Sequence, residues 1–369
     1  MPNRILLAGL KVIFRSAALF DRPAPPWDPG SVRSILLVNT TAMGDTLLST
    51  PAIRAIRGAF PKANLVSLAS RAAKEVLLHN PHLDRIIDHP GRVDLSFFFR
   101  LPKLLKAIRA EQCDLAVILD GNDPEAVPLA YLSGARYRIG WSGSRLAFLL
   151  THPVDFNIPG RHHIEIWEEH LSAFGIRPQG SDMELTLSKE EKEEADRHLT
   201  ARRLSDCRIA GLHPFARKLA GKEWPFDRVV ALSALLADQG YRPVLFGGKQ
   251  EKERAEEMVR KSDGKLASFA GDLSLRQTMA LIARCELFIS LDSGPMHLSQ
   301  ALGVPTLALF GPSDPRASGP LKKSSAAVLK KEFACSPCGW SPCPHDVACM
   351  RAIEVNEVAE AARSLVRVR

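Results

Sequence analysis

The sequence predicts an α/β protein made of two halves, each with a doubly wound parallel sheet. Three observations favour this class. Short apolar segments, typical of buried strands, alternate with amphipathic segments of helical length. The alternation occurs twice, on either side of a region around residues 150–180 that has little strand signal. The length of 369 residues also suits two domains of ordinary size.

The first half begins with a buried-strand run at 34–39, and further strands are expected at 64–69, 85–88, 114–119 and 136–141. The segment after the first strand is typical of an amphipathic helix, because its apolar residues fall on one face: Leu47, Leu48, Ile53 and Ile56. Strands that alternate with helices of this length predict a parallel sheet covered on both faces.

The second half repeats the pattern after a charged helix, whose start at Ser188 has a capping box with Glu191. Strands are expected at 208–214, 242–248, 286–291 and 304–311, and helices at 226–240, 249–264, 274–285 and 295–303. Doubly wound sheets bind ligands at the carboxyl ends of their strands. We therefore expect the site in a cleft between two facing halves.

Four parts are expected along the chain: an amphipathic extension with a Pro-rich linker over 1–30, a first domain over 31–185, a second domain over 186–350 and a closing helix over 351–369 that crosses back to the first domain. The extension is not typical of a signal peptide, because Lys11 and Arg15 interrupt its apolar region. It either lies on a membrane surface or packs on the fold. No run of about 18 apolar residues predicts a membrane span.

The formal net charge of +8 suits an anionic ligand or an anionic membrane surface. No long Lys/Arg tract interleaved with aromatic residues indicates nucleic acid, so we expect no nucleic-acid partner. The absence of a signal peptide favours a reducing, cytoplasmic location.

The turn DSGPMH is the first candidate anion site, because it lies where a buried strand becomes a helix. Asp292 or Ser293 can cap the helix, and Gly294 lets a ligand approach the backbone. Free N–H groups at a helix start attract phosphate, and His297 lies one turn inside. The alternative is plain helix capping. A second glycine-proline turn after the next strand favours a ligand.

Three further loops contain charged candidates. Lys222 follows the strand at 208–214 and can supply positive charge to a diphosphate, although a solvated basic loop explains it equally well. Glu251 follows the strand at 242–248, where an acidic residue can bind a ribose diol or simply begin an exposed helix. Asp45 follows the first strand and is either a helix cap or a carboxylate that acts as general base.

Together these motifs resemble the heptosyltransferase-type glycosyltransferases, family 9 of the GT-B fold. The strongest marker is DSGPMHLSQALGVPTLALFGPSDP, followed by MGDTLLSTPAIRAIR and GKEWP. The resemblance covers Ser34 to the C-terminus and implies two Rossmann-like domains that face each other across a cleft. It further implies transfer of a sugar, here a heptose from ADP-heptose, to a lipopolysaccharide-core-type glycolipid, with inversion at the anomeric carbon.

The resemblance also implies roles for individual residues. Asp45 corresponds to the catalytic base. The donor is implied to contact Lys222, Asp292, Ser293, Gly294, His297 and, at its ribose, Glu251. Because core acceptors are anionic sugars, acceptor contacts are expected from Arg54, Arg57 and Arg71, although an exposed helix face explains these arginines equally well. One departure concerns the acceptor: a position that is often basic in the family is Asn39 here.

No Asp-x-Asp pair occupies the expected place, so we expect catalysis without a metal or other cofactor. The late cysteines Cys335, Cys338, Cys343 and Cys349 have a C-x2-C-x4-C-x5-C spacing. Four thiols with a C-x2-C start resemble a closed structural zinc site, yet the spacing between the pairs is short for one. A loop of free or disulfide-capable thiols is the alternative.

A related glycosyltransferase that uses another donor is one alternative. Two other functions remain as alternatives to a glycosyltransferase. A non-catalytic nucleotide-sugar or glycan-binding module would not need both Asp45 and Lys222, and both are present. A dinucleotide-dependent oxidoreductase is disfavoured because no strand is followed by G-x-G-x-x-G. The favoured function places the protein in the cytoplasm, with peripheral contact to the cytoplasmic face of the inner membrane.

Overall fold

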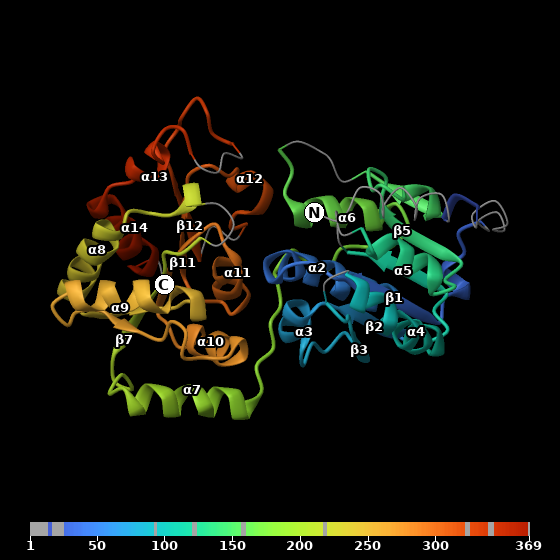
Figure 1. Ribbon diagram of the computed structural model, residues 1–369, viewed down its shortest axis with the longest axis horizontal. Coiled ribbons are helices and arrows are strands. Elements are labelled where there is room, and N and C mark those ends of the chain that lie inside the picture. Colours follow the sequence, from blue (N-terminus) through green and yellow to red (C-terminus); the bar gives the residue numbers. More distant parts are fainter. Residues whose placement is uncertain are drawn as a thin grey trace. The chain divides into compact units, whose positions relative to one another are not determined.

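The computed structural model describes residues 14–16, 26–91, 94–119, 124–155, 160–216, 220–321, 325–338 and 343–367. The chain divides into two units, Met1–Ser181 and Asp182–Arg369. Each unit is a parallel sheet covered by helices (Figure 1). The two-domain α/β prediction is therefore confirmed.

The first unit contains six parallel strands in the order β3-β2-β1-β4-β5-β6. The strands are β1 (Ser34–Asn39), β2 (Asn64–Ala69), β3 (Arg85–Asp88), β4 (Leu115–Ile118), β5 (Tyr137–Trp141) and β6 (His152–Val154). Every residue of β1 is buried, as expected for a central strand packed on both faces. The sequence did not predict β6, a three-residue edge strand.

Helices cover both faces of this sheet: α2 (Met43–Ala59), α3 (Arg71–Leu77), α4 (Leu95–Ala110), α5 (Ala126–Leu132) and α6 (His163–Ser172). One apolar cluster joins α2, α3 and α6 to the sheet. A second cluster joins α4 and α5 to the opposite face. Side chains of β1 alternate between the two clusters, since successive residues of a strand point to opposite faces.

The second unit repeats the topology in the order β12-β11-β10-β7-β8-β9. Its strands are β7 (Arg208–His213), β8 (Tyr241–Leu245), β9 (Ala267–Ser268), β10 (Leu287–Leu291), β11 (Thr306–Phe310) and β12 (Ala326–Lys330). Gly211 is required in β7, because a Cβ there would lie 2.4 Å from the ring of Phe288. The sequence analysis did not predict the edge strands β9 and β12.

The helices of the second unit are α7 (Lys189–Ala201), α8 (Phe226–Asp238), α9 (Lys252–Lys261), α10 (Leu275–Ile282), α11 (Gly294–Ala301), α12 (Pro315–Ser318), α13 (Ala348–Arg351) and α14 (Val355–Arg367). The predicted capping box of α7 is present: Ser188 Oγ accepts from Glu191 N at 3.3 Å, and Glu191 Oε2 accepts from Ser188 N at 2.8 Å. The closing helix differs from expectation, because α14 packs on α8, β10, β11 and β12 of its own unit.

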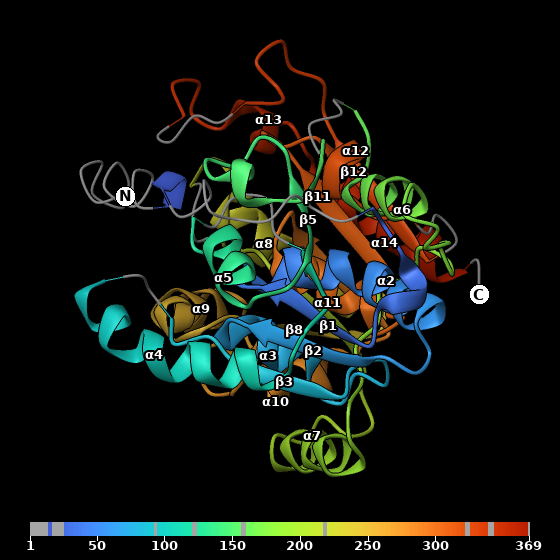
Figure 2. The same cartoon turned by 90° about the vertical axis from the view of Figure 1, so that its right-hand side faces the viewer.

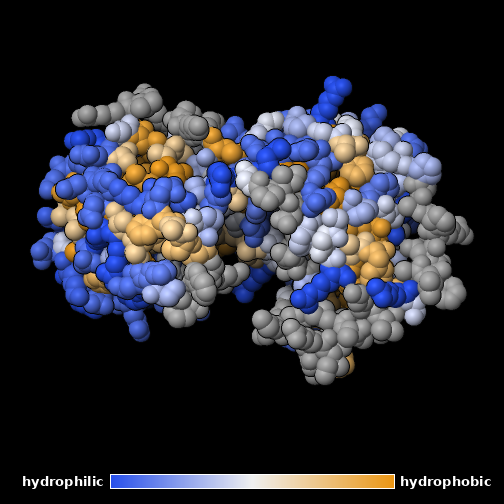
Figure 3. Space-filling model, turned by 90° about the horizontal axis from the view of Figure 1, so that it is seen from above, coloured by the Kyte–Doolittle hydropathy of each residue, from blue (hydrophilic) through white to orange (hydrophobic). Residues whose placement is uncertain are grey.

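The membrane-surface prediction concerns residues 1–30, most of which lie outside the described residues. Phe14 is buried, and its ring meets that of Tyr131 at 6.0 Å between centroids. This part of the extension therefore packs on the first unit. Among the described residues, no helix is long and apolar enough to cross a membrane. Figure 3 shows hydrophilic side chains over much of one face, with hydrophobic residues in separate patches.

Candidate functional site

Both sheets share one feature that positions a site. The strand order reverses direction between β1 and β4 in the first sheet and between β7 and β10 in the second. At such a switch point the connections leave the carboxyl edge toward opposite faces, which opens a crevice for ligands. The predicted residues Lys222 and Asp292 follow β7 and β10, and Asp45 follows β1.

Lys222 and Asp292 form an ion pair at the switch point of the second sheet. The Nζ–Oδ2 distance is 2.5 Å, and the two side chains are only 21% and 11% exposed. Burial alone would raise the pKa of Asp292, but the hydrogen bond and charge of Lys222 keep that pKa below its usual value. The pair therefore places a cation, held by a carboxylate, at the carboxyl edge of the sheet.

The helix that follows Asp292 starts without a side-chain cap. Ser293 occupies the N-cap position of α11 with an extended backbone, yet its hydroxyl does not bond the first turn. No described residue accepts a hydrogen bond from the amide of Gly294. His297 lies one turn inside the helix and is 5% exposed. An uncapped helix start beside Lys222 can bind an anion.

His213, which the sequence analysis did not single out, explains why Ser293 does not cap. Its Nδ1 atom lies 3.2 Å from Ser293 Oγ, and Ser290 Oγ lies 3.1 Å from the same oxygen. Burial lowers the pKa of His213 to about 4, so the ring is neutral at pH 7. His213 could have been found from the sequence by its position, because it is the last residue of a buried strand and is followed by a proline.

The loop that carries Lys222 is fixed by its neighbours. Glu223 forms a two-pronged ion pair with Arg254 at 2.9 and 2.8 Å and accepts a hydrogen bond from Ala216 N. Trp224 is buried and donates to the carbonyl of Ile353 at 3.0 Å. Two cations of this loop, Arg217 and Lys218, lie outside the described residues.

Asp45 lies in the first turn of α2, which follows β1. Its side chain is exposed and accepts a hydrogen bond from Thr41 Oγ1 at 3.1 Å. It does not cap the helix, since the N-cap Ala42 has no side-chain capping bond. The hydroxyl of Ser70 donates to Thr41 O at 2.8 Å and so links the turns after β1 and β2. The carboxylate is thus available at the switch point of the first sheet.

The family model for glycosyltransferase family 9 (heptosyltransferase) matches residues 101–348. The chain belongs to this family. Lipooligosaccharide heptosyltransferase 2 of Campylobacter jejuni is 32% identical over 352 residues, which cover 89% of this chain and 96% of that protein. The enzyme of the same name from Haemophilus influenzae is 26% identical over 320 residues, covering 80% and 88%.

Solved structures support the same fold for this family 9 member. A glycosyltransferase family 9 structure from Veillonella parvula has a TM-score of 0.79 at 24% identity, covering 91% of this chain and 98% of that one. The ADP-heptose lipopolysaccharide heptosyltransferase II of Escherichia coli has a TM-score of 0.73 at 23% identity, covering 90% and 98%. The fold is therefore GT-B, and the protein is a glycosyltransferase.

Two of the three predicted acceptor arginines of this glycosyltransferase are used to stabilise α2. Arg54 donates to the carbonyls of Gln179 and Gly180. Arg57 pairs with Asp84 at 2.5 Å and also donates to backbone carbonyls. At ~1.5 Å rise per residue, Arg54 and Arg57 lie roughly 14 and 18 Å along the helix from Asp45. The structure does not bring them together with the carboxylate.

Arg71 differs from those two arginines. It is exposed at the start of α3, directly after Ser70, and no described residue pairs with it. Asn39, the departure from the family pattern, is fully buried and donates from Nδ2 to Ser49 Oγ at 3.1 Å. Its side chain is turned into the interior of the first unit.

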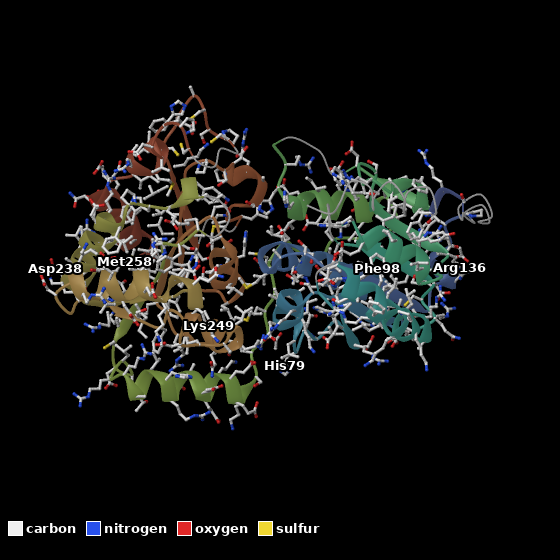
Figure 4. The ribbon with its side chains drawn as sticks, in the orientation of Figure 1. His79, Phe98, Arg136, Asp238, Lys249 and Met258 are labelled. Carbon is white, nitrogen blue, oxygen red and sulfur yellow. The ribbon has the colours of Figure 1, made fainter. Side chains whose placement is uncertain are left out.

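Glu251 is placed at the loop after β8, close to the start of α9. Its Oε2 accepts a hydrogen bond from Gly248 N at 2.8 Å, so the side chain stabilises the helix start. Its other oxygen has no partner among the described residues. Figure 4 labels Lys249, which lies in the same loop. Glu251 therefore stabilises an exposed helix start, which was the alternative to ribose binding. Its second carboxylate oxygen is left for a ligand.

The cysteine segment supports the turn after β11. Ser336 Oγ donates to Gly311 O at 2.6 Å, and Cys338 N donates to Pro312 O at 2.7 Å. Gly311 lies so close that a Cβ would come within 3.0 Å of Cys349 Sγ. All four cysteines are free, and no three metal-binding side chains among the described residues are arranged to hold an ion. The structural zinc site and the loop of free thiols therefore both remain predictions from the spacing.

Proposed function

We propose that the protein is an inverting heptosyltransferase that transfers heptose from ADP-heptose to a lipopolysaccharide-core-type acceptor. The names of the family relatives support heptose as the sugar and a lipooligosaccharide as the acceptor. The E. coli enzyme of the same fold is described as an ADP-heptose enzyme, which supports the donor.

The observation that carries this proposal is the Lys222–Asp292 pair beside the uncapped start of α11. The donor diphosphate binds between Lys222 Nζ and the amide of Gly294, with His297 one turn inside. The free oxygen of Glu251 binds the ribose. Lys222 Nζ and the amide of Gly294 are hydrogen-bond donors at the place where negative charge develops, so they stabilise the departing diphosphate.

The chemical step uses Asp45 as general base. An acceptor hydroxyl attacks the anomeric carbon from the face opposite the diphosphate, and Asp45 takes the proton of that hydroxyl. A new carbon–oxygen bond forms as the bond to the diphosphate breaks, and its electron pair leaves with ADP. The configuration at the anomeric carbon is inverted. A general base of this kind contributes about 10²–10⁴-fold to the rate.

The leaving group is neutralised by protein groups, so the reaction proceeds without a divalent metal. Lys222 and the start of α11 supply the positive potential that a metal would otherwise supply. Transfer should continue at an unchanged rate in the presence of a chelator. A rate that falls with chelator and returns with magnesium would contradict metal independence.

The acceptor is an anionic glycolipid, which we place on the first unit near Arg71. With a glycolipid as acceptor, we propose that the protein works at the cytoplasmic face of the inner membrane. Arg71→Ala should therefore raise the KM for the acceptor without changing the affinity for ADP. Arg57→Ala should instead lower stability, because its guanidinium bonds Asp84 and three backbone carbonyls.

Isothermal titration with ADP, GDP, UDP and ADP-heptose tests the donor site. We expect selective binding of ADP and ADP-heptose that is lost in Lys222→Ala. Lys249→Ala is the matched control, because it removes a nearby exposed lysine that has no ion-pair partner among the described residues. Selective binding of UDP or GDP would overturn the ADP-heptose assignment. Absence of all nucleotide binding by the folded protein would overturn catalysis itself.

A further inference from the structure

Helix α4 presents an amphipathic outer face that packs on nothing in the described chain. The side chains on its inner face, Phe97, Leu104 and Ile108, are buried. Leu104 and Ile108 belong to the apolar cluster on this face of the first sheet. On the outer face, Phe99 is 87% exposed, more than any other large hydrophobic side chain described. Lys103 and Lys106 follow at helical spacing, so the three side chains form one stripe.

The stripe is strongly positive. The sixteen residues of α4 include four basic side chains and no acidic one. Arg100 lies 3.9 Å from Asp94 Oδ1 and bonds backbone carbonyls, and Arg109 bonds the carbonyl of Leu132, so the positive charge of the stripe comes from Lys103 and Lys106. Lys103 and Lys106 form no ion pair with any described residue. An uncompensated row of cations beside an exposed aromatic ring is complementary to an anionic surface that also has an apolar layer.

The position of α4 in the fold relates this stripe to the candidate site. The helix follows β3, so its first turn lies at the carboxyl edge of the first sheet, the edge that also carries Asp45. The first turn is anchored there, since the rings of Phe97 and His89 meet at 5.5 Å. Figure 2 shows α4 along the rim of the unit, and Figure 4 labels Phe98 on the same helix.

We propose that the outer face of α4 docks on an anionic lipid bilayer. The helix lies parallel to the membrane, with Phe99 inserted at the interface and the ammonium groups of Lys103 and Lys106 at lipid phosphates. This rests on the proposed function, since a glycolipid acceptor must be met at a bilayer.

Co-sedimentation of the full-length protein with vesicles tests this surface. The vesicles contain phosphatidylethanolamine with phosphatidylglycerol, and phosphatidylcholine vesicles serve as the neutral comparison. Lys103→Glu/Lys106→Glu should weaken binding to the anionic vesicles roughly tenfold or more, because each basic residue near such a surface contributes about a factor of five. Phe99→Ser should weaken it by about fivefold, and added salt should weaken wild-type binding.

Lys192→Glu/Lys265→Glu is the matched control, because both lysines are exposed, lie on the second unit and have no ion-pair partner among the described residues. Both double variants lower the formal net charge of +8 by four units. Equal binding by the two double variants would show a general charge effect and overturn the proposal. Wild-type protein that binds neither vesicle, or both equally, would overturn it as well.

Binding of ADP to the same variants separates this inference from the proposed function. The α4 variants should retain wild-type ADP affinity, because the donor groups belong to the other unit. Loss of vesicle binding with intact ADP binding supports the docking surface. If vesicle binding depends on α4 but the protein binds no ADP, the docking surface is supported. Only the donor proposal is then overturned.

Discussion

The Nδ1 atom of His213 lies 3.2 Å from Ser293 Oγ, and this contact determines how α11 begins. Ser290 Oγ donates to the carbonyl of Leu291 at 3.0 Å and lies 3.1 Å from Ser293 Oγ. These contacts hold Ser293 Oγ beside His213 and Ser290, and the hydroxyl makes no capping bond to the first turn of α11.

His213→Leu should weaken ADP binding about fivefold to tenfold. Without the imidazole, Ser293 Oγ is free to cap the amide of Met296, since Pro295 has no N–H, and such a cap contributes ~1 kcal/mol. The turned hydroxyl then occupies space beside the Gly294 amide, where the diphosphate binds. His213→Asn keeps an N–H donor near the position of Nδ1 and should stay within about threefold of wild type by the same energy scale. Isothermal titration of both variants, with thermal unfolding as a check on folding, measures the difference. Equal affinities of the two variants would contradict this positioning role.

Lys222→Ala and Asp292→Asn should change ADP affinity in opposite directions. The first variant removes the cation that meets the diphosphate, so the affinity should fall at least about tenfold, as for loss of a charged hydrogen bond. The second removes a carboxylate that repels the same diphosphate, so binding should tighten by about threefold. Transfer should nevertheless be slower in Asp292→Asn, because Lys222 is no longer held in place. Weaker ADP binding by Asp292→Asn would instead indicate that the carboxylate contacts the donor directly.

Asp45→Asn should lower kcat by about 10²–10⁴-fold while ADP affinity stays unchanged. The amide keeps the shape and can still meet Thr41, but it cannot accept the proton of the acceptor hydroxyl. Steady-state kinetics with saturating donor, together with titration of ADP, separate the two effects. Asp88→Asn is a suitable control, since Asp88 is an exposed carboxylate of the same unit that pairs with Lys74 at the surface. A kcat within a few-fold of wild type would remove Asp45 from the chemistry.

The central strands of both sheets were predictable because they are continuous apolar runs bounded by turns. β1 and β10, for example, are buried at every residue, which is the pattern that a sequence displays most clearly. The edge strands β6, β9 and β12 were missed because they are two to five residues long and partly exposed. Their sequences have neither the length nor the alternation that distinguishes a strand from a loop.

The candidate site was predictable only in part, because some of its contacts join segments that are far apart in the sequence. Lys222, Asp292 and Asp45 lie in turns after predicted strands, so their loops could be located from the sequence. The role of His213 depends on its contact with Ser293, 80 residues away. That contact follows from the register of β7 and β10, which places His213 opposite Ser290. Strand order and register are set by the packing of the whole unit and are not encoded in any short segment.

Arg276→Ala should lower the free energy of unfolding by about 3–5 kcal/mol. Arg276 is 7% exposed and joins α10 to the start of α7 through Glu191 Oε2 at 2.5 Å and the carbonyl of Thr186. Its loss leaves a largely buried carboxylate without its cation. Arg284→Ala is the matched control, because Arg284, two residues beyond the end of α10, pairs with Asp196 of α7 and both side chains are 50% exposed.

The control should change stability by less than about 1 kcal/mol, as is usual for an exposed pair. Urea unfolding of the two variants measures both values. Similar losses in the two variants would show that burial does not decide the strength of these bridges.

Acidification from pH 7 to pH 5 should destabilise the protein through its buried histidines. Burial lowers the pKa of His213 to about 4, and burial together with the charge of Arg100 lowers the pKa of His89 to about 4. An unfolded histidine titrates near ~6.5, so between these values the unfolded chain binds more protons than the folded one. Stability that is fully present above pH 6.5 is therefore lost as the pH falls, by at most ~1.4 kcal/mol per pH unit for each ring.

Urea unfolding at pH 7, 6 and 5 measures this slope. His89→Gln should reduce the slope, because it removes one buried ring, whereas His79→Gln is the control at an exposed histidine. A slope that is the same in wild type and His89→Gln would mean that His89 binds its proton equally in both states. Its ring would then be accessible to water in the folded protein, in contradiction to its 7% exposure.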